Sequence, residues 1–89
     1  MAHIVKRSRH SEPFSRDKLH RSVVKSCLST RTPIGEAIMT AEHVCLHVVQ
    51  WLAKREEVTS ADIRRKAHEI LEVHNPDAAT VYEQFDVLA

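Results

Sequence analysis

Apolar residues recur at helical spacing along most of this chain, and the longest such pattern lies in its middle. The intervals between apolar positions there are four, three, four, three and four residues, which is the period of one helix face. The pattern ends near Lys54-Arg55 and follows Thr32-Pro33, a helix N-cap with Pro at the first helical position. We predict one long helix with these residues turned inward: Ile34, Ile38, Ala41, Cys45, Val48 and Leu52.

A shorter helix is predicted before it, from about Arg16 to Leu28. Ser15 is a strong N-cap residue, and Phe14 and Leu19 have the spacing of a hydrophobic staple around that cap. The inner face of this helix is expected to carry Leu19, Val23 and Cys27.

Two further helices are predicted in the second half of the chain. Ser60 is expected to cap the first, and Asn75-Pro76-Asp77 repeats the cap-plus-Pro pattern at the start of the second. The predicted inward residues are Ile63, Ala67, Ile70 and Leu71 in the first, and Val81, Tyr82, Phe85 and Leu88 in the second.

Three short segments are predicted to be strands. They are residues 3–7, with the β-branched pair Ile4-Val5, then residues 12–14, and residues 57–59. The predicted order is therefore β-β-α-α-β-α-α. Helices this short must pack on one another, and three strands allow only a small sheet over one end. We predict an α+β fold, a four-helix bundle capped by a small three-stranded sheet.

Size and composition indicate one domain over residues 1–89 with one modest core. No apolar run approaches the roughly 20 residues of a membrane span, and the first 20 residues are too polar for a signal peptide. A cytoplasmic protein is expected. Cys27 and Cys45 are then expected to be reduced and buried, not joined in a disulfide.

Charge is distributed unevenly along the chain. The first 31 residues hold eight Lys or Arg and two Asp or Glu, whereas the remainder holds five and ten. This basic segment contains one glutamate before the predicted helix. Such a segment suits a small polyanion whose head group can be recognised by specific contacts, such as a nucleotide. From charge alone, the alternative that these cations are solvated surface residues stays open, with Glu12 as their ion-pair partner.

Four segments together resemble a known family. They are Lys6-Arg7, Glu12-Pro13-Phe14, Asp17-Lys18-Leu19 and the run from Val58 to Ile63. With this spacing the chain resembles the ATP-cone domain, the allosteric nucleotide-binding module of many ribonucleotide reductases and of the repressor of their genes. The resemblance covers nearly the whole chain. It implies the same helical bundle with a small sheet, and binding of ATP or dATP without catalysis.

The resemblance implies a role for nine residues. Ile4 would meet the adenine through its backbone, Leu19 would pack near the base, and Glu12 and Ser15 would hydrogen-bond the adenine edge. Phosphate contacts would come from Lys6, Arg7 and Lys18, with Ser60 near the phosphates and Arg64 near the sugar. Any Mg²⁺ would be held by the phosphates.

Two further features of the long helix bear on possible chemistry. His43 and His47 have the spacing of a zinc-binding pair, but Cys45 faces another side of the helix and no metal site is predicted. Val44, Val48 and Trp51 widen the apolar face of the long helix, which suggests contact with a partner or a second copy. No phosphate-binding glycine loop or catalytic triad is present in the sequence, so an enzyme is not expected.

The leading hypothesis is a free-standing ATP-cone that signals its nucleotide state to a partner through a change in oligomerisation, with a ribonucleotide reductase as the first candidate partner. The alternative is a small nucleic-acid-binding or transcription-regulating protein that uses the basic segment. Only Phe14 interrupts that segment as an aromatic, and the total charge is only +1, which disfavours nucleic acid. A third reading is a protein-interaction bundle without a ligand.

Overall fold

The computed structural model describes residues 3–5 and 11–88, and the side chains of residues 14–84. The elements follow the predicted order. They are β1 (His3–Val5), β2 (Ser11–Pro13), α1 (Arg16–Ser29), α2 (Ile34–Leu52), β3 (Glu57–Thr59), α3 (Ser60–His74) and α4 (Pro76–Leu88).

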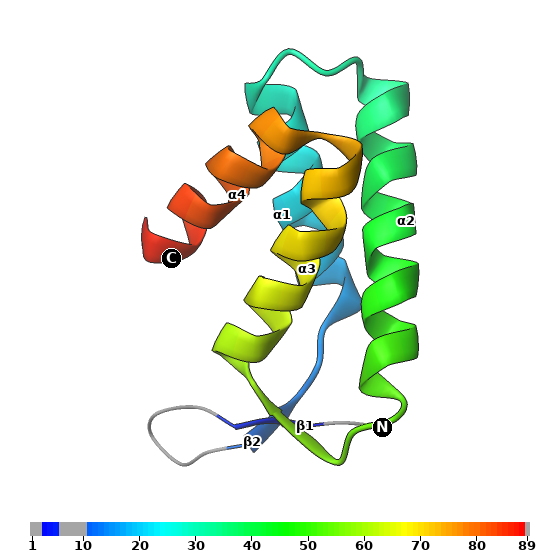
Figure 1. Cartoon of the computed structure of the whole chain (residues 1–89), viewed down its shortest axis with the longest axis vertical. Helices are drawn as coiled ribbons and strands as arrows, with labels where there is room; N and C mark the ends of the chain where they lie inside the picture. Colours follow the sequence, from blue (N-terminus) through cyan, green and yellow to red (C-terminus); the bar gives the residue numbers. More distant parts are fainter. Residues whose placement is uncertain (1–2, 6–10, 89) are drawn as a thin grey trace.

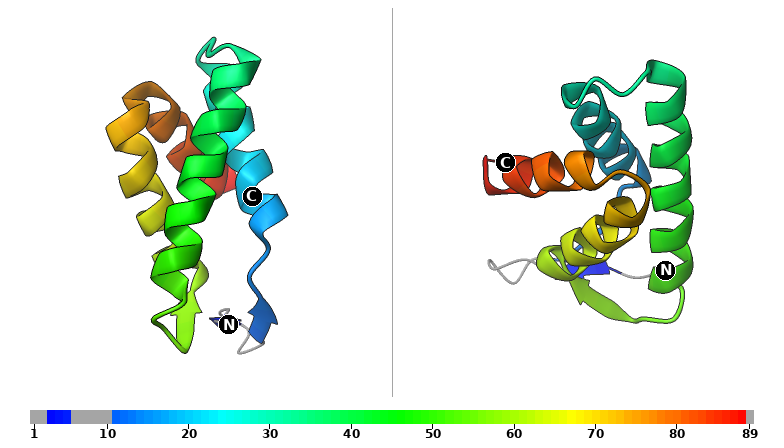
Figure 2. Two further views of the ribbon diagram at one scale, coloured as in Figure 1. Left: turned by 90° about the vertical axis from the view of Figure 1, so that its right-hand side faces the viewer. Right: turned by 45° about the horizontal axis from the view of Figure 1, so that its top comes forward.

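The longest helix, α2, runs along one side of the molecule, and α1 and α3 pack against it (Figure 1). Helix α4 turns away from α2 and packs against α1 and α3, as the turned views show (Figure 2). The strands lie together at one end of this arrangement, on the side where α3 begins. Within the described residues, no helix is long and apolar enough to cross a membrane.

The predicted fold class requires correction, because helices dominate this fold. The four helices have 14, 19, 15 and 13 residues, whereas each strand has only three. β1 pairs antiparallel with β2 and parallel with β3. β3 is the one strand whose side chains are described, and it supplies a single core residue, Val58.

A strand of three residues can turn only one or two side chains to one face, so these strands do not form a layer. Their main contacts are with one another, and β3 adds contacts with α3. The description as an α+β bundle capped by a three-stranded sheet was therefore wrong. The protein is a helical bundle with a minimal strand pairing beside the start of α3.

Small side chains dominate the buried face of α2. Ile34 and Ile38 were predicted to face inward, but 57% and 43% of their surface is exposed. The buried residues are Ala37, Ala41, Val44, Cys45, Val48 and Leu52. The helix is therefore rotated toward its alanines, which let α1 and α3 approach closely. Val44 and Val48 belong to this core, so the contact surface predicted around them was wrong.

Both cysteines are free and buried, as predicted. Burial raises the pKa of the Cys45 thiol to about 11, and it raises the pKa of Cys27 in the same direction. A thiol that resists ionisation is a poor nucleophile and a poor metal ligand. These side chains act as small apolar groups of the core.

The predicted caps of α1 and α4 are confirmed. The Ser15 hydroxyl accepts a hydrogen bond from the Lys18 N–H, and Asn75 accepts one from the Ala78 N–H. Pro33 stands at the N-cap of α2 without a side-chain bond, so the expected Thr32 cap was wrong.

The Thr32 hydroxyl instead accepts a hydrogen bond from the side-chain amide of Asn75 at 3.0 Å. This contact joins the α1–α2 connection to the corner between α3 and α4. One Asn75 side chain therefore both starts α4 and holds it against the neighbouring loop.

Helix α1 ends in a Schellman motif. The N–H of Thr32 donates to the Cys27 carbonyl, and the N–H of Arg31 donates to the Leu28 carbonyl, both at 3.1 Å. Arg31 holds the left-handed position of this motif, with φ of 63°. Glycine is favoured at that position because a Cβ atom is strained there.

We predict that Arg31→Gly stabilises the fold by about 1 kcal/mol, because it removes strain at the left-handed residue. Arg31 is exposed, so little packing is lost. Urea unfolding would measure the change, and Arg31→Ala, which keeps the Cβ atom, is the control. A stability of Arg31→Gly equal to or below that of Arg31→Ala would contradict the prediction.

Candidate functional site

The strands bring three distant parts of the chain into one row. Ile4 of β1 is the register partner of Glu12 on one side and of Val58 on the other. Thr59 follows Val58 and leads directly into α3. The backbone of Ile4 and Glu12, two of the predicted site residues, is therefore held beside the start of a helix.

The start of α1 presents a second part of the candidate site. The Ser15 hydroxyl is engaged by the Lys18 N–H at 3.3 Å, and the side chain of Lys18 is exposed. Leu19, one position further, is buried in the core and was predicted to lie near a base. The exposed Lys18 therefore lies between the bonded Ser15 and the buried Leu19 at this N-terminus.

The start of α3 is fixed by a capping box that the sequence reading missed. The Thr59 hydroxyl accepts a hydrogen bond from the Asp62 N–H at 3.0 Å, and the Asp62 carboxylate accepts one from the Thr59 N–H at 3.1 Å. The cap is therefore Thr59 and not Ser60. The Thr-x-x-Asp spacing could have identified it.

These hydrogen bonds also favour the ionised form of the Asp62 carboxyl group. The hydrogen bonds from Thr59 lower the pKa of the Asp62 carboxyl, and Arg65 at 3.7 Å lowers it further. Ser60 is the first residue of α3 and is partly exposed, while Arg64 is exposed one turn later. Residues four apart share a helix face, so Ser60 and Arg64 lie on the same side of α3.

A second polar group joins α1 to the middle of α2. Arg16 donates to the Glu42 carboxylate at 2.6 Å, and His20 lies 3.0 Å from the other Glu42 oxygen. The hydrogen bond with Glu42 raises the pKa of Arg16, and the same bond lowers the pKa of Glu42. Arg16 is thus engaged with Glu42, whereas Lys18 was the cation of this helix predicted to meet phosphates.

Four of the nine predicted residues cannot be placed as side chains. Lys6 and Arg7 lie outside the described residues, and Ile4 and Glu12 are described by their backbone alone. Five side chains are described. Ser15, Lys18 and Leu19 belong to the first turns of α1, whereas Ser60 and Arg64 belong to the first turns of α3.

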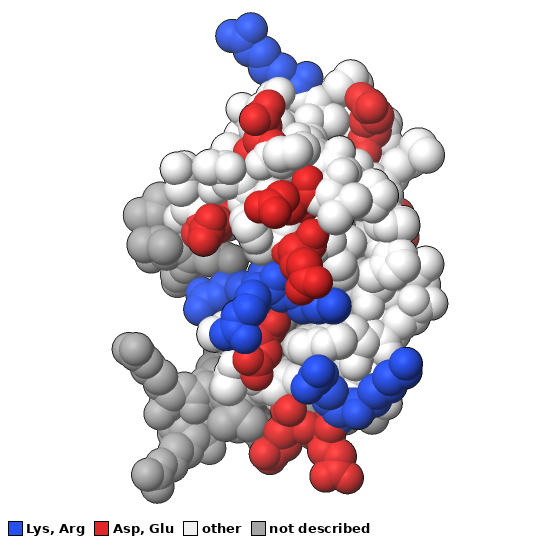
Figure 3. Space-filling view, in the orientation of Figure 1, with Lys and Arg blue, Asp and Glu red and all other residues white. Residues whose placement is uncertain are grey.

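Lys and Arg side chains gather in the middle of one molecular face, across α3 and below α4 (Figure 3). Asp and Glu side chains border this group above and below. A second group of cations lies nearer the end that carries the strands. This pattern favours a small anion over a long, uniformly charged polymer.

Comparison with protein families gives one match. The model described as the ATP cone domain matches residues 2–85, which is nearly the whole chain. A comparison with curated proteins found no match. The matched range includes all nine residues named above.

Three histidines meet where α2 packs beside the end of α3. The ring centroids of His43 and His47 are 4.3 Å apart, and those of His43 and His74 are 4.2 Å apart. Among the described residues, no group of three or more His, Cys, Asp or Glu is arranged to hold a metal ion. Burial lowers the pKa of His43, and the charges of His74 and His47 lower it further.

We predict that stability falls as pH drops through the histidine range. The pKa of His43 is lowered on folding, so below its ordinary value of about 6.5 the unfolded chain binds a proton more readily. Stability from this group is complete above that value and is lost below it. The thermal midpoint should fall between about pH 8 and about pH 5, and fall less in His43→Gln.

His68→Gln is the control, because the His68 ring lies near the Glu72 and Glu83 carboxylates and not near another imidazole. In His68→Gln the thermal midpoint should fall with pH as steeply as in the native chain. An equally steep decline in the native chain and in His43→Gln would remove the assignment to this cluster.

Proposed function

Because the chain belongs to the ATP-cone family, a family of regulatory nucleotide-binding domains, we propose that it binds ATP or dATP beside its strands. Bound nucleotide would then change how the chain associates with itself or with a partner. The observation that carries this proposal is the register of Glu12, Ile4 and Val58, because it brings the backbone of two residues expected to contact the base beside the start of α3.

Two helix starts support binding of an anion at this end. The exposed Lys18 belongs to the first turn of α1, while Ser60 and the exposed Arg64 share one face of the first turns of α3. The free N–H groups of a helix N-terminus favour negative charge. Lys offers a compact charge, and Arg can contact two phosphate oxygens at once.

In this proposal Glu12 accepts the exocyclic amine of adenine, with Ser15 beside it. Lys6, Arg7 and Lys18 hold the phosphates, and any Mg²⁺ is carried by the phosphates. A ligand can shift an equilibrium only between states that it binds unequally. Nucleotide binding would therefore favour one state of association, and a ribonucleotide reductase is the natural first candidate as the regulated partner.

A thermal-shift screen tests the class of ligand. The native chain would be heated with ATP, dATP, GTP, CTP or a DNA duplex at equal concentration. Adenine nucleotides should raise the unfolding temperature the most, because a ligand that binds only the folded state stabilises it by mass action. A larger shift with DNA than with any nucleotide would instead support the nucleic-acid alternative.

We predict that Lys18→Ala weakens ATP or dATP binding at least about tenfold. Removing one charge from a convergent phosphate site costs about 1.5–3 kcal/mol, because hydrogen bonds to charged groups are the strong ones. Lys25→Ala is the matched control, since Lys25 lies two turns further along the same helix and is also exposed. Isothermal titration calorimetry of both variants would measure the difference.

The same pair of variants separates a nucleotide from a nucleic-acid backbone. On a backbone the two lysines would be nearly equivalent, and each substitution would reduce the salt dependence of binding by about one ion. Equal, modest losses for Lys18→Ala and Lys25→Ala, with DNA bound more tightly than ATP, would overturn the nucleotide proposal.

A further inference from the structure

The outer side of α2 carries most of the exposed apolar surface. Seven large apolar side chains are exposed among the described residues, and only Val73 lies outside the α1–α2 side. The other six are Leu28 of α1 and Ile34, Ile38, Met39, Leu46 and Val49 of α2. The α2 members fall within an arc of about 140° at about 100° per residue, so they share one face. We call this the outer face of α2.

Within the described residues these apolar side chains stay exposed, although Arg16 and His20 of α1 reach Glu42 at the middle of the face. With the molecule turned to show its right-hand side, α2 lies in front and the other helices lie behind it (Figure 2, left). An exposed apolar surface of this extent marks an interaction site.

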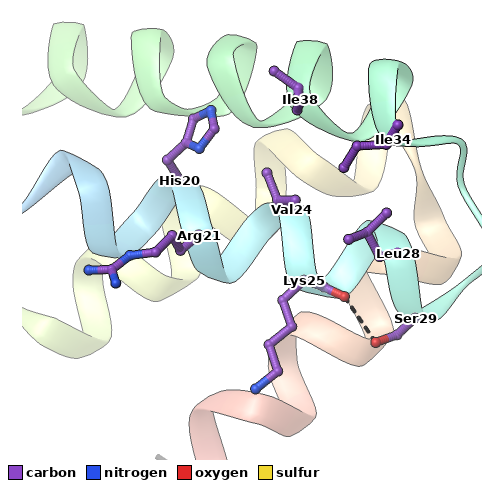
Figure 4. Close-up of a pocket in the computed structure, with 8 residues that line it drawn as sticks. All are labelled: His20, Arg21, Val24, Lys25, Leu28, Ser29, Ile34 and Ile38. Carbon is purple, nitrogen blue, oxygen red and sulfur yellow. Dashed lines mark hydrogen bonds between the residues drawn. The ribbon is translucent and has the colours of Figure 1, made fainter.

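At one end the outer face opens into a groove between α1 and α2, with a volume of about 530 Å³. Val24 and Leu28 of α1 face Ile34 and Ile38 of α2 across this groove, while Lys25 points away from α2 (Figure 4). The centre of the groove is therefore apolar.

Gly35 lies beside this groove and has no role within its own chain. Its φ is not positive, and a Cβ atom placed on it would meet nothing within 4 Å. Glycine lowers helix stability relative to alanine, so a helical glycine without an internal reason points to close approach by another backbone. The missing side chain leaves room for a helix to lie against α2.

We propose that this helix is α2 of a second copy, packed antiparallel about a two-fold axis at Glu42. Residues equally distant from Glu42 then face each other. Val49 of one copy lies over Gly35 of the other, and Leu46 lies against Ile38. Because a two-fold axis repeats each contact, the projecting side chains at one end of α2 fill the groove at the other end in both directions.

Charge also favours a second copy over a charged partner. Glu42 is the only charged residue of α2 within the outer face, and it is already paired with Arg16 and His20 of its own chain. Two such faces can meet without setting unpaired like charges together. A strongly charged helix would find no opposite charge on this face.

The dimer surface gives a location for the proposed change in oligomerisation. Its role in regulation rests on the proposed function, whereas the dimer itself does not.

Sedimentation equilibrium of the full chain without nucleotide, from micromolar to millimolar concentration, should show a dimer. Leu46→Glu should raise the dissociation constant at least about 100-fold, because each dimer would bury two unpaired carboxylates. Val73→Glu, on α3, should leave it unchanged.

Cysteine variants test the antiparallel register. Oxidation of a mixture of Ile38→Cys and Leu46→Cys chains should give a cross-linked dimer, whereas Ile38→Cys alone should give little. Cross-linking of Ile38→Cys to itself, with none in the mixture, would overturn this register.

A chain that is monomeric throughout, or a dimer that survives Leu46→Glu, would overturn the inference. Calorimetry with ATP on Leu46→Glu separates this result from the proposed function, because the exposed Leu46 is not among the residues proposed to bind nucleotide. Retained ATP binding in a monomeric variant would support the dimer surface and leave nucleotide binding intact. Absence of ATP binding by the native chain, with its dimer present, would count against the proposed function alone.

Discussion

Close packing of α2 through small side chains is the constraint on which this fold depends. Ala37 and Ala41 are fully buried, and Ala67, Ala78 and Ala79 are buried on the helices around them. Side chains without long branches let helix axes come near one another, and close packing then supplies dispersion contacts along their length. A larger residue at Ala41 would have to displace its neighbours, because nothing there is exposed.

The rotation of α2 could not be predicted from its apolar spacing. The apolar residues from Ile34 to Leu52 establish the helical period. They cover a wide sector of the helix surface, however, so the spacing alone does not show which part of that sector faces the core. The alanines face the core, because their small side chains allow close contact between helices, and Ile34 and Ile38 are therefore exposed. The caps at Ser15 and Asn75 could be predicted, because each depends on one side chain and a backbone N–H three residues later.

The candidate site was predictable to different degrees at its two ends. The start of α1 follows from local chemistry, and the structure agrees with the predicted cap. The start of α3 was shifted by one residue, because Thr59 was assigned to a strand and its reciprocal bonds with Asp62 were overlooked. The pairing of Ile4 with Val58 is parallel and joins distant segments, which no local pattern encodes.

That distant pairing has a consequence for the order in which the molecule folds. His3 pairs with Glu57, so β1 and β3 can meet only after a loop of more than fifty residues has closed. The helix contacts between α1 and α2, and between α3 and α4, join neighbours in the chain and can form earlier. We therefore expect the parallel pairing to form late and to open before the helical core does. Hydrogen exchange at the amides of β3 would then report sub-global opening and not the full free energy of unfolding.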